Sequence, residues 1–318
     1  MKKEQPYQNP IVCERADPWV YKHTDGYYYF TGSVPGYKVI ELRRAKSLNE
    51  LREAEAVNVW TAPENGWNSR LIWAPELHYI EGKWYVYFAA SGESEDPSIS
   101  IHHRMFVIEC SDENPLIGEW VEKGVVKTHQ DSFSLDATVF SHRDELYYVW
   151  AQKEPAIKGN SNLYIAKMLN PWTIKGTPTL LTIPEYDWEK ITYLVNEGPA
   201  VIERDGKIII TYSASATEEN YAMGMLWADA NNDLLNGFSW HKSSTPVFES
   251  SESNQQFGPG HNSFTKSEDG AHDVLIYHAR PKKNTFDNPL NNPDRHARAQ
   301  FFDWNDEGLP IFGEPIAD

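Results

Sequence analysis

A short pattern, a turn followed by an aromatic or β-branched strand, occurs five times along the 318-residue chain at nearly even spacing. The turn positions are Gly26, Gly82, Glu145, Gly206 and Gly270, so successive copies are 56, 63, 61 and 64 residues apart. Each copy continues into a run rich in Tyr, Val, Ile or Trp, which favours a β-strand. A hairpin repeat of this length is typical of radially stacked four-stranded sheets. The sequence therefore predicts an all-β fold, a five-bladed β-propeller that occupies residues 1–318 as a single domain.

A polar residue in an apolar segment stands nine residues before four of the five turn positions. These residues are Asp17, Asp136, Glu197 and His261, and in the second copy the same position is Trp73. Equivalent positions of a radial repeat lie at the same depth near the axis, so we expect these side chains to converge at one end of the central channel. Any one carboxylate is also compatible with a turn cap or a solvated residue, but the shared position argues against that explanation.

Three converging carboxylates indicate glycoside hydrolysis. One carboxylate activates water, a carboxylic acid protonates the leaving oxygen, and a third negative charge raises the pKa of that acid. Glu197 follows Tyr193, Leu194 and Val195 closely, and this apolar context favours the protonated form. A calcium site is the alternative explanation, because Ca²⁺ prefers hard oxygen ligands.

The composition narrows the range of partners. The net charge of −17 would repel phosphate backbones, which argues against a nucleic-acid partner. No apolar run is long enough to cross a membrane, and the N-terminal residues carry no apolar core of a secretory signal. Cys13 and Cys110 have neither metal-ligand nor redox spacing. These features predict a cytoplasmic protein without a membrane partner.

Helical periodicity is scarce, and the best helical candidate is residues 44–57. Residues 281–294 predict a polar loop, because Asn, Asp, Lys and Pro dominate them. Residues 295–304 predict a last strand. A terminal segment of a propeller commonly completes a blade begun elsewhere in the chain, and we expect such closure here.

Taken together, the segments around these positions resemble glycoside hydrolase family 43, whose members are five-bladed propellers that remove arabinofuranosyl or xylosyl units from plant polysaccharides. The resemblance covers essentially the whole chain, and it depends on the order and spacing of five motifs rather than on any single one. The motifs are Ala16-Asp17-Pro18, Trp73-Ala74-Pro75-Glu76, Leu135-Asp136-Ala137, Asn196-Glu197-Gly198-Pro199 and Gly258-Pro259-Gly260-His261.

The resemblance implies a role for each acid. Asp17 would be the general base that activates water, Glu197 the general acid, and Asp136 the residue that tunes the pKa of the acid and orients it. The family inverts the anomeric centre in one displacement, which implies that Asp17 and Glu197 lie roughly 6.5–9.5 Å apart with the water between them. No cofactor for catalysis is implied.

The resemblance also implies contacts outside the three acids. The family's histidine at the position of His261 lies near the axis and often ligates a calcium or sodium ion, and a hydrogen-bonded histidine that braces the channel is the alternative. Arg295 matches the family's substrate-binding arginine better than Arg298 does, and it is expected beside the acid carboxylate; solvated strand arginines are the alternative. Trp73 is expected to stack on the sugar, unless it belongs to the core of its blade.

The expected substrate is an arabinose- or xylose-containing oligosaccharide derived from arabinan or arabinoxylan. The segments 102–110 and 312–315 resemble the single-domain arabinofuranosidase branch, and no residues follow Asp318 for the C-terminal sandwich of the family's β-xylosidases. This favours exo-acting release of terminal α-L-arabinofuranose. A β-xylosidase or a dual activity is the nearest alternative, and an endo-arabinanase with an open cleft is another. A non-catalytic carbohydrate-binding propeller is the alternative of a different class. The oligomeric state stays open.

Overall fold

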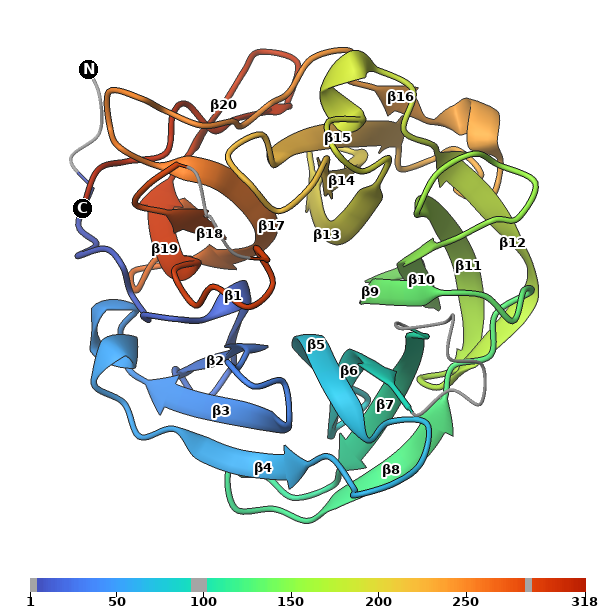
Figure 1. Cartoon of the computed structure of the whole chain (residues 1–318), viewed down its shortest axis with the longest axis vertical. Helices are drawn as coiled ribbons and strands as arrows, with labels where there is room; N and C mark the ends of the chain where they lie inside the picture. The colour runs from blue at the N-terminus through green and yellow to red at the C-terminus, as the bar shows by residue number, and fades with distance from the viewer. Residues whose placement is uncertain (1–4, 93–101, 284–287) are drawn as a thin grey trace.

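The computed structural model describes residues 5–92, 102–283 and 288–318, which form five blades around a central axis (Figure 1). The prediction of an all-β, five-bladed β-propeller is confirmed. The first four blades are four-stranded antiparallel sheets whose strands follow one another outward from the axis. The fifth blade has three strands of its own.

The strands of the first four blades are β1 (Ala16–Lys22), β2 (Tyr28–Ser33), β3 (Val39–Ala45) and β4 (Val57–Thr61); β5 (Arg70–Ile80), β6 (Lys83–Ser91), β7 (Arg104–Cys110) and β8 (Trp120–Val125); β9 (Ser134–His142), β10 (Glu145–Gln152), β11 (Asn162–Asn170) and β12 (Thr173–Thr182); and β13 (Asn196–Arg204), β14 (Lys207–Ala214), β15 (Ala222–Asp229) and β16 (His241–Lys242). The fifth blade contains β17 (Phe257–Lys266), β18 (Asp273–Arg280) and β19 (His296–Phe301), followed by the ribbon of β20 (Asp303–Trp304) and β21 (Pro310–Ile311). Short 3₁₀ helices are η1 (Asn49–Arg52), η2 (Asp187–Glu189) and η3 (Gly237–Ser239).

The innermost strands β1, β5, β9, β13 and β17 enclose the axis, and each contacts the innermost strands of both neighbouring blades. Aromatic side chains of the repeated runs fill the space between blades. The rings of Tyr29 and Trp84 lie 4.9 Å apart between the first and second blades, and those of Tyr87 and Tyr148 lie 5.9 Å apart between the second and third. The aromatic repeat in the sequence thus supplies the packing that holds the blades together.

The N-terminal segment closes the ring. Val12 pairs with Ala297 of β19 in an antiparallel bridge, and the Ile11 N–H donates to the Ala297 carbonyl at 2.8 Å. The Ala299 N–H donates to the Asn9 side chain, also at 2.8 Å. Residues 9–12 therefore lie along the outer strand of the fifth blade. The expected closure is confirmed, with the N-terminal segment as the added edge.

Each innermost strand is interrupted by a β-bulge near its start. One residue of each bulge has a positive φ, between 44° and 55°, and these residues are Asp17, Ala74, Asp136, Gly198 and His261. Bulges re-aim side chains, and the left-handed conformation is tolerated by Asp and Gly better than by most residues. The bulges are therefore the points at which side chains of the innermost strands are redirected toward the central channel.

The hairpin turns show that the alignment of the five copies needs a correction. The two central residues have positive φ in the turns Glu81-Gly82, Arg143-Asp144 and Asp205-Gly206, as in type I′ turns, and Glu145 is already the first residue of β10. Aligning Glu145 with the glycines is thus wrong by one residue. Asp136 is equivalent to Gly198, and Glu197 stands one position before its bulge.

The prediction of a helix at residues 44–57 is wrong. β3 continues to Ala45, which pairs with Tyr28 of β2, and only η1 is helical before β4 begins at Val57. The Glu50 side chain accepts hydrogen bonds from the Lys46 and Ser47 N–H groups at 3.1 and 3.2 Å, which holds the chain in a tight turn. Pairing with the neighbouring strand overrides the local helical pattern.

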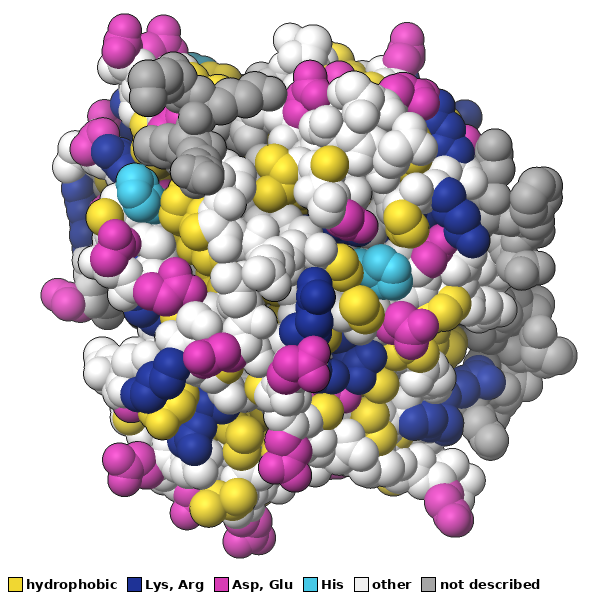
Figure 2. Space-filling view, turned by 90° about the vertical axis from the view of Figure 1, so that its left-hand side faces the viewer, with side chains coloured by type: hydrophobic (Ala, Val, Ile, Leu, Met, Phe, Trp, Pro, Cys, Tyr) yellow, Lys and Arg dark blue, Asp and Glu magenta, His cyan; other side chains and the backbone are white. Residues whose placement is uncertain are grey.

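The predicted loop at residues 281–294 carries no strand in its described parts, and residues 284–287 lie outside the described structure. The predicted last strand corresponds to β19 and β20, which are separated at Phe302. Among the described helices, none is long and apolar enough to cross a membrane. On the face drawn in Figure 2, basic side chains are interspersed with acidic ones rather than gathered in a stripe.

Candidate active site

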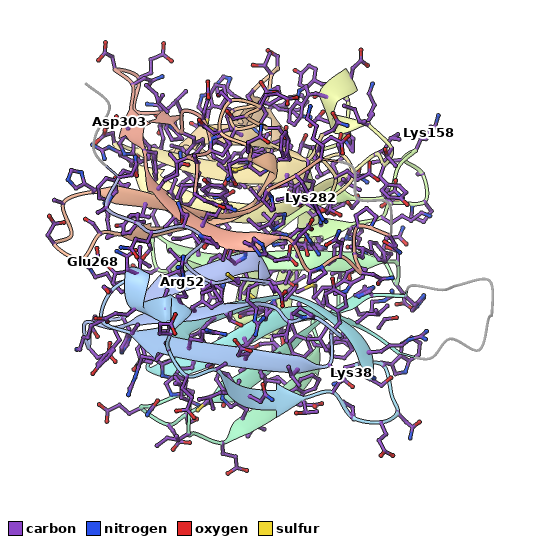
Figure 3. The ribbon with its side chains drawn as sticks, turned by 60° about the vertical axis from the view of Figure 1, so that its left-hand side comes forward. Lys38, Arg52, Lys158, Glu268, Lys282 and Asp303 are labelled. Atoms are coloured by element: carbon purple, nitrogen blue, oxygen red, sulfur yellow. The ribbon has the colours of Figure 1, made fainter. Side chains whose placement is uncertain are left out.

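A cavity of about 460 Å³ opens at the end of the axis where the bulges lie. Figure 3 shows the two ends of the propeller: Glu268, in the β17–β18 turn, lies at one, and Lys158, in the β10–β11 loop, lies at the other. The cavity is at the Lys158 end, because Lys153, Asn160 and Ser161 of the same region line it. All six side chains singled out in the sequence line this cavity: Asp17, Trp73, Asp136, Glu197, His261 and Arg295.

Asp17 is buried and held by contacts from three blades. Its Oδ2 accepts a hydrogen bond from Ser33 Oγ at 2.5 Å, and Ser33 Oγ in turn accepts the Ala74 N–H of the second blade at 2.8 Å. Its Oδ1 lies 3.3 Å from Arg295 Nη1, and its backbone N–H donates to His278 Nδ1 at 3.0 Å. The carboxylate therefore has a fixed position.

The surroundings of Asp17 favour its ionised form. Burial by itself would raise its pKa, but His261, Arg295 and His278 lower the pKa of Asp17 below its ordinary value. Burial also lowers the pKa of His261 and lowers that of His278 to about 3, so both rings are neutral near pH 7. Arg295 is consequently the cation that keeps Asp17 charged.

Asp136 contacts the backbone next to Glu197. Its Oδ2 accepts the Gly198 N–H at 3.1 Å, which ties the third blade to the fourth. Burial, together with the nearby carboxylates of Glu197 and Asp17, raises the pKa of Asp136 well above its ordinary value. Asp136 thus fixes the Gly198 backbone beside Glu197 and interacts electrostatically with both other acids.

Glu197 is half-buried and faces the cavity. Burial raises the pKa of Glu197 to about 7, and the charge of Asp17 adds to the increase, whereas the hydrogen bond from Tyr221 and the charge of Arg295 oppose it. Tyr221 donates that hydrogen bond from its hydroxyl to Glu197 Oε1 at 2.9 Å. The pKa values of Asp17 and Glu197 are therefore shifted in opposite directions within one cavity.

His261 lies between two of the acids. Its Nδ1 is 3.3 Å from Asp17 Oδ1 and 3.7 Å from Asp136 Oδ2, and its backbone N–H donates to Ser213 Oγ at 2.8 Å. In the described part of the chain, no group of three or more His, Cys, Asp or Glu side chains is arranged to hold a metal ion. A calcium or sodium ion fits this donor set poorly, because a hard cation needs several oxygen ligands and His261 offers one nitrogen. The contacts favour a bracing histidine.

Arg295 and Arg298 serve different regions. Arg295 Nη1 contacts Asp17, and its Nη2 donates to the Tyr37 hydroxyl at 3.4 Å. Its charge also acts on Glu197, where it opposes the increase in pKa. Arg298 is fully buried and pairs with the Asp318 side chain. Neither arginine is solvated. Arg295 belongs to the site, and Arg298 fastens the end of the chain.

Trp73 packs against the core and also borders the cavity. The residue precedes the bulge of β5, and its ring lies flat on His103 at 3.8 Å with an interplanar angle of 21°. The ring also lines the cavity, and its Nε1 is buried without a hydrogen-bond partner in the described structure. His103 therefore supports one face of a wall that borders the cavity.

Four residues with direct contacts to the acids or Arg295 were not predicted: Ser33, Tyr37, Tyr221 and His278. They come from the ends of β2 and β18 and from the loops that precede β3 and β15. Ser33 and His278 lie near the ends of two repeated strands, but their residue types differ between copies, and Tyr37 and Tyr221 lie in loops outside the repeat. The repeat locates only residues on the innermost strands, whereas these residues reach the site from the second strands and the loops.

Two carboxyl groups that share one cavity, with pKa values shifted in opposite directions, are the arrangement expected of a glycoside hydrolase. The chain matches the family model described as glycosyl hydrolases family 43 over residues 7–310, and it belongs to that family.

Curated relatives of the chain carry consistent names. It is 53% identical to an extracellular exo-α-(1→5)-L-arabinofuranosidase of Streptomyces avermitilis over 98% of its length, and 49% identical to α-L-arabinofuranosidase 43 of Humicola insolens over 98%. The chain spans 64% of the length of each of these two proteins. It is also 49% identical to the extracellular exo-α-(1→5)-L-arabinofuranosidase of Streptomyces chartreusis, with 89% of this chain and 85% of that protein covered.

The chain is also similar in fold to a protein of known structure. The crystal structure of an α-L-arabinofuranosidase from Lactobacillus brevis has a TM-score of 0.95 and 56% identity, covering 98% of this chain and 97% of that one. The prediction of a cytoplasmic protein is contradicted, because two of the curated relatives are named extracellular enzymes. That prediction used the composition of the N-terminal residues and the spacing of the two cysteines.

Proposed function

We propose that the chain is an exo-acting, inverting α-L-arabinofuranosidase that removes terminal arabinofuranose from α-(1→5)-linked oligosaccharides. The observation that carries the proposal is the opposite shift of two pKa values in one cavity, below the ordinary value at Asp17 and to about 7 at Glu197. The names of the relatives at 44–56% identity support arabinofuranose as the sugar and, for two of them, the linkage.

Each step of the hydrolysis has a residue suited to it. Asp17, ionised, takes a proton from water as the water oxygen bonds to the anomeric carbon from the face opposite the leaving group. Glu197, protonated, gives its proton to the glycosidic oxygen as the carbon–oxygen bond breaks. Free arabinose and the shortened oligosaccharide leave, and exchange with solvent returns the two carboxyl groups to their starting states. Asp136 holds the acid through the Gly198 N–H.

Two buried donors are candidates for binding the sugar. Arg295 Nε and Trp73 Nε1 have no hydrogen-bond partner among the described residues, and both residues line the cavity. Leaving a buried donor without a partner is costly, so hydroxyl groups of the arabinose would complete these contacts. No step uses a cofactor, and a calcium or sodium ion at His261 is not part of the proposal.

The alternative activities have weaker support. A xylan β-1,4-xylosidase and an endo-arabinase with solved structures are 15% and 17% identical to the chain, which is evidence for the fold alone. A non-catalytic binding propeller has no need for two acids held in different protonation states. Paired assays with nitrophenyl α-L-arabinofuranoside and nitrophenyl β-D-xyloside test the choice: faster hydrolysis of the xyloside would contradict the proposal.

The first product should have the inverted configuration. Because water attacks the anomeric carbon directly, an α-arabinofuranoside is expected to release β-arabinofuranose before mutarotation. Proton NMR during the first minutes of the reaction measures this. Release of the α-anomer would indicate a covalent intermediate and would contradict the assignment of Asp17 as a base.

The pH dependence should follow Glu197 on the alkaline side. Only the protonated acid can donate, so kcat/KM for an arabinose disaccharide is expected to fall about tenfold per pH unit above pH 7. On the acid side, Asp17 must be ionised, and its lowered pKa keeps activity at pH values below the ordinary range of Asp. A profile that stays flat through alkaline pH would contradict the role of Glu197.

A further inference from the structure

Tyr221 and His278 form a stacked pair that touches both candidate catalytic carboxyl residues. Their rings lie 5.6 Å apart with an interplanar angle of 9°. The Tyr221 hydroxyl donates to Glu197 Oε1 at 2.9 Å, and His278 Nδ1 accepts the Asp17 N–H at 3.0 Å. Because Nδ1 is an acceptor, the proton of the neutral ring is on Nε2. One rigid unit therefore contacts the fourth blade at one end and the first blade at the other.

The pair is held in place by the fifth blade. His278 lies on β18, and Gly260 of β17 is its partner across the ladder. A Cβ atom added to Gly260 would come within 2.7 Å of the Tyr221 ring, so only glycine leaves room for that ring. Both side chains are buried, Tyr221 with 1% and His278 with 1% of the surface exposed. The ring of Tyr221 consequently has no freedom to move away from Glu197.

We infer that Tyr221 and His278 together act as a spacer that sets the position of Glu197 relative to Asp17. This inference rests on the proposed function, since an inverting hydrolase needs its acid and base at a separation that admits one water. The spacer links carboxyl groups of the first and fourth blades through Tyr221 of the fourth blade and His278 of the fifth. Tyr221 is a positioning residue for the acid, and His278 is a positioning residue for the base.

The two ends of the spacer should give different kinetic signatures. In Tyr221→Phe the acid loses its hydrogen bond, so kcat/KM for an arabinose disaccharide is expected to fall about tenfold. An activated dinitrophenyl arabinofuranoside, whose leaving group needs no proton, should be hydrolysed at nearly the original rate. In His278→Phe the flat ring is retained but the Asp17 N–H loses its acceptor, so both substrates should be hydrolysed about tenfold more slowly.

The alkaline limb of the pH profile is a second readout for Tyr221. Glu197 is faced by Asp17 and Asp136, by Arg295 and by the Tyr221 hydroxyl. The hydrogen bond from Tyr221 stabilises the carboxylate, so its removal should move the alkaline limb upward by about one pH unit. A purely structural role for Tyr221 would leave this limb where it is.

The matched control is Tyr277→Phe. Tyr277 is fully buried beside His278 in β18, and its hydroxyl donates to Gln300 Oε1 at 2.9 Å, away from the acids. This variant loses an equivalent hydrogen bond, so it should change thermal stability without changing either the leaving-group dependence or the pH profile. If Tyr221→Phe behaves like this control, the inference is wrong.

Crystal structures of the variants test the spacer separately from the proposed function, because a structure can be solved whether or not the protein is active. Tyr221→Phe should show the Glu197 carboxyl group in a new position, and His278→Phe should show a shifted bulge at Asp17. Unchanged carboxyl positions in both variants would overturn the spacer. Failure of the unmodified protein to hydrolyse arabinofuranosides would overturn the proposed function and not the structural coupling.

Discussion

Replacing Asp17 by asparagine should reduce kcat for every arabinofuranoside by about 10³- to 10⁴-fold, because an amide cannot take the proton from water. The loss should be the same for natural disaccharides and for activated nitrophenyl substrates, since both need the attacking water. Asparagine is the preferred replacement because residue 17 has a φ of 55°, which asparagine tolerates better than alanine. Steady-state kinetics on both substrates measure the effect.

The thermal unfolding midpoint of the asparagine variant is the necessary control. An amide at this position can still accept the Ser33 hydrogen bond, so the variant should fold. A folded variant that keeps turnover near that of the original protein would show that Asp17 is not the base.

Replacing Glu197 by glutamine should produce a loss that depends on the leaving group. Hydrolysis of an α-(1→5)-linked disaccharide is expected to slow about 10²- to 10⁴-fold, because the glycosidic oxygen leaves without a proton. A dinitrophenyl leaving group is stable as an anion, and its release should slow by less than about tenfold. The alkaline limb near pH 7 should also disappear, because the group that titrates there is gone.

Glutamine retains an oxygen that accepts the Tyr221 hydrogen bond, so the side chain should stay in place. Comparison with Asp17→Asn gives the internal control, since that variant should lose both substrates equally. Equal losses on both substrates in the glutamine variant would instead mean that Glu197 has another role.

The fold prediction is correct where the sequence pattern is repeated along the chain. Five copies of a turn and an aromatic strand predict five blades, because each blade needs the same hairpin and the same large side chains between blades. It failed where a local pattern stands alone. Residues 44–57 have a helical pattern, yet Ala45 pairs with Tyr28 of the preceding strand, and such pairing is not visible within the helical pattern itself.

The six side chains predicted to converge do line one cavity, although the alignment that pointed to them contains an error. Counting nine residues back from Glu145 aligned Asp136 with Glu197, although their bulges show that Asp136 is equivalent to Gly198. Asp136 and Glu197 nevertheless line the same cavity, because a residue at a bulge or next to it can face the end of the axis. The compartment was predicted wrongly, because the composition of a few terminal residues carries little information about where a folded domain works.

The sequence by itself determined the number of blades, the innermost strands and the three acids, because these depend on residues close together in the chain and repeated along it. Only the tertiary structure decided which neighbours shift the pKa values of these acids. Asp17 is kept ionised by Arg295, which is 278 positions away, and Glu197 is held by Tyr221 from a loop with no repeated pattern. A pKa depends on burial and on charges within a few ångströms, and the folded chain alone brings those neighbours together.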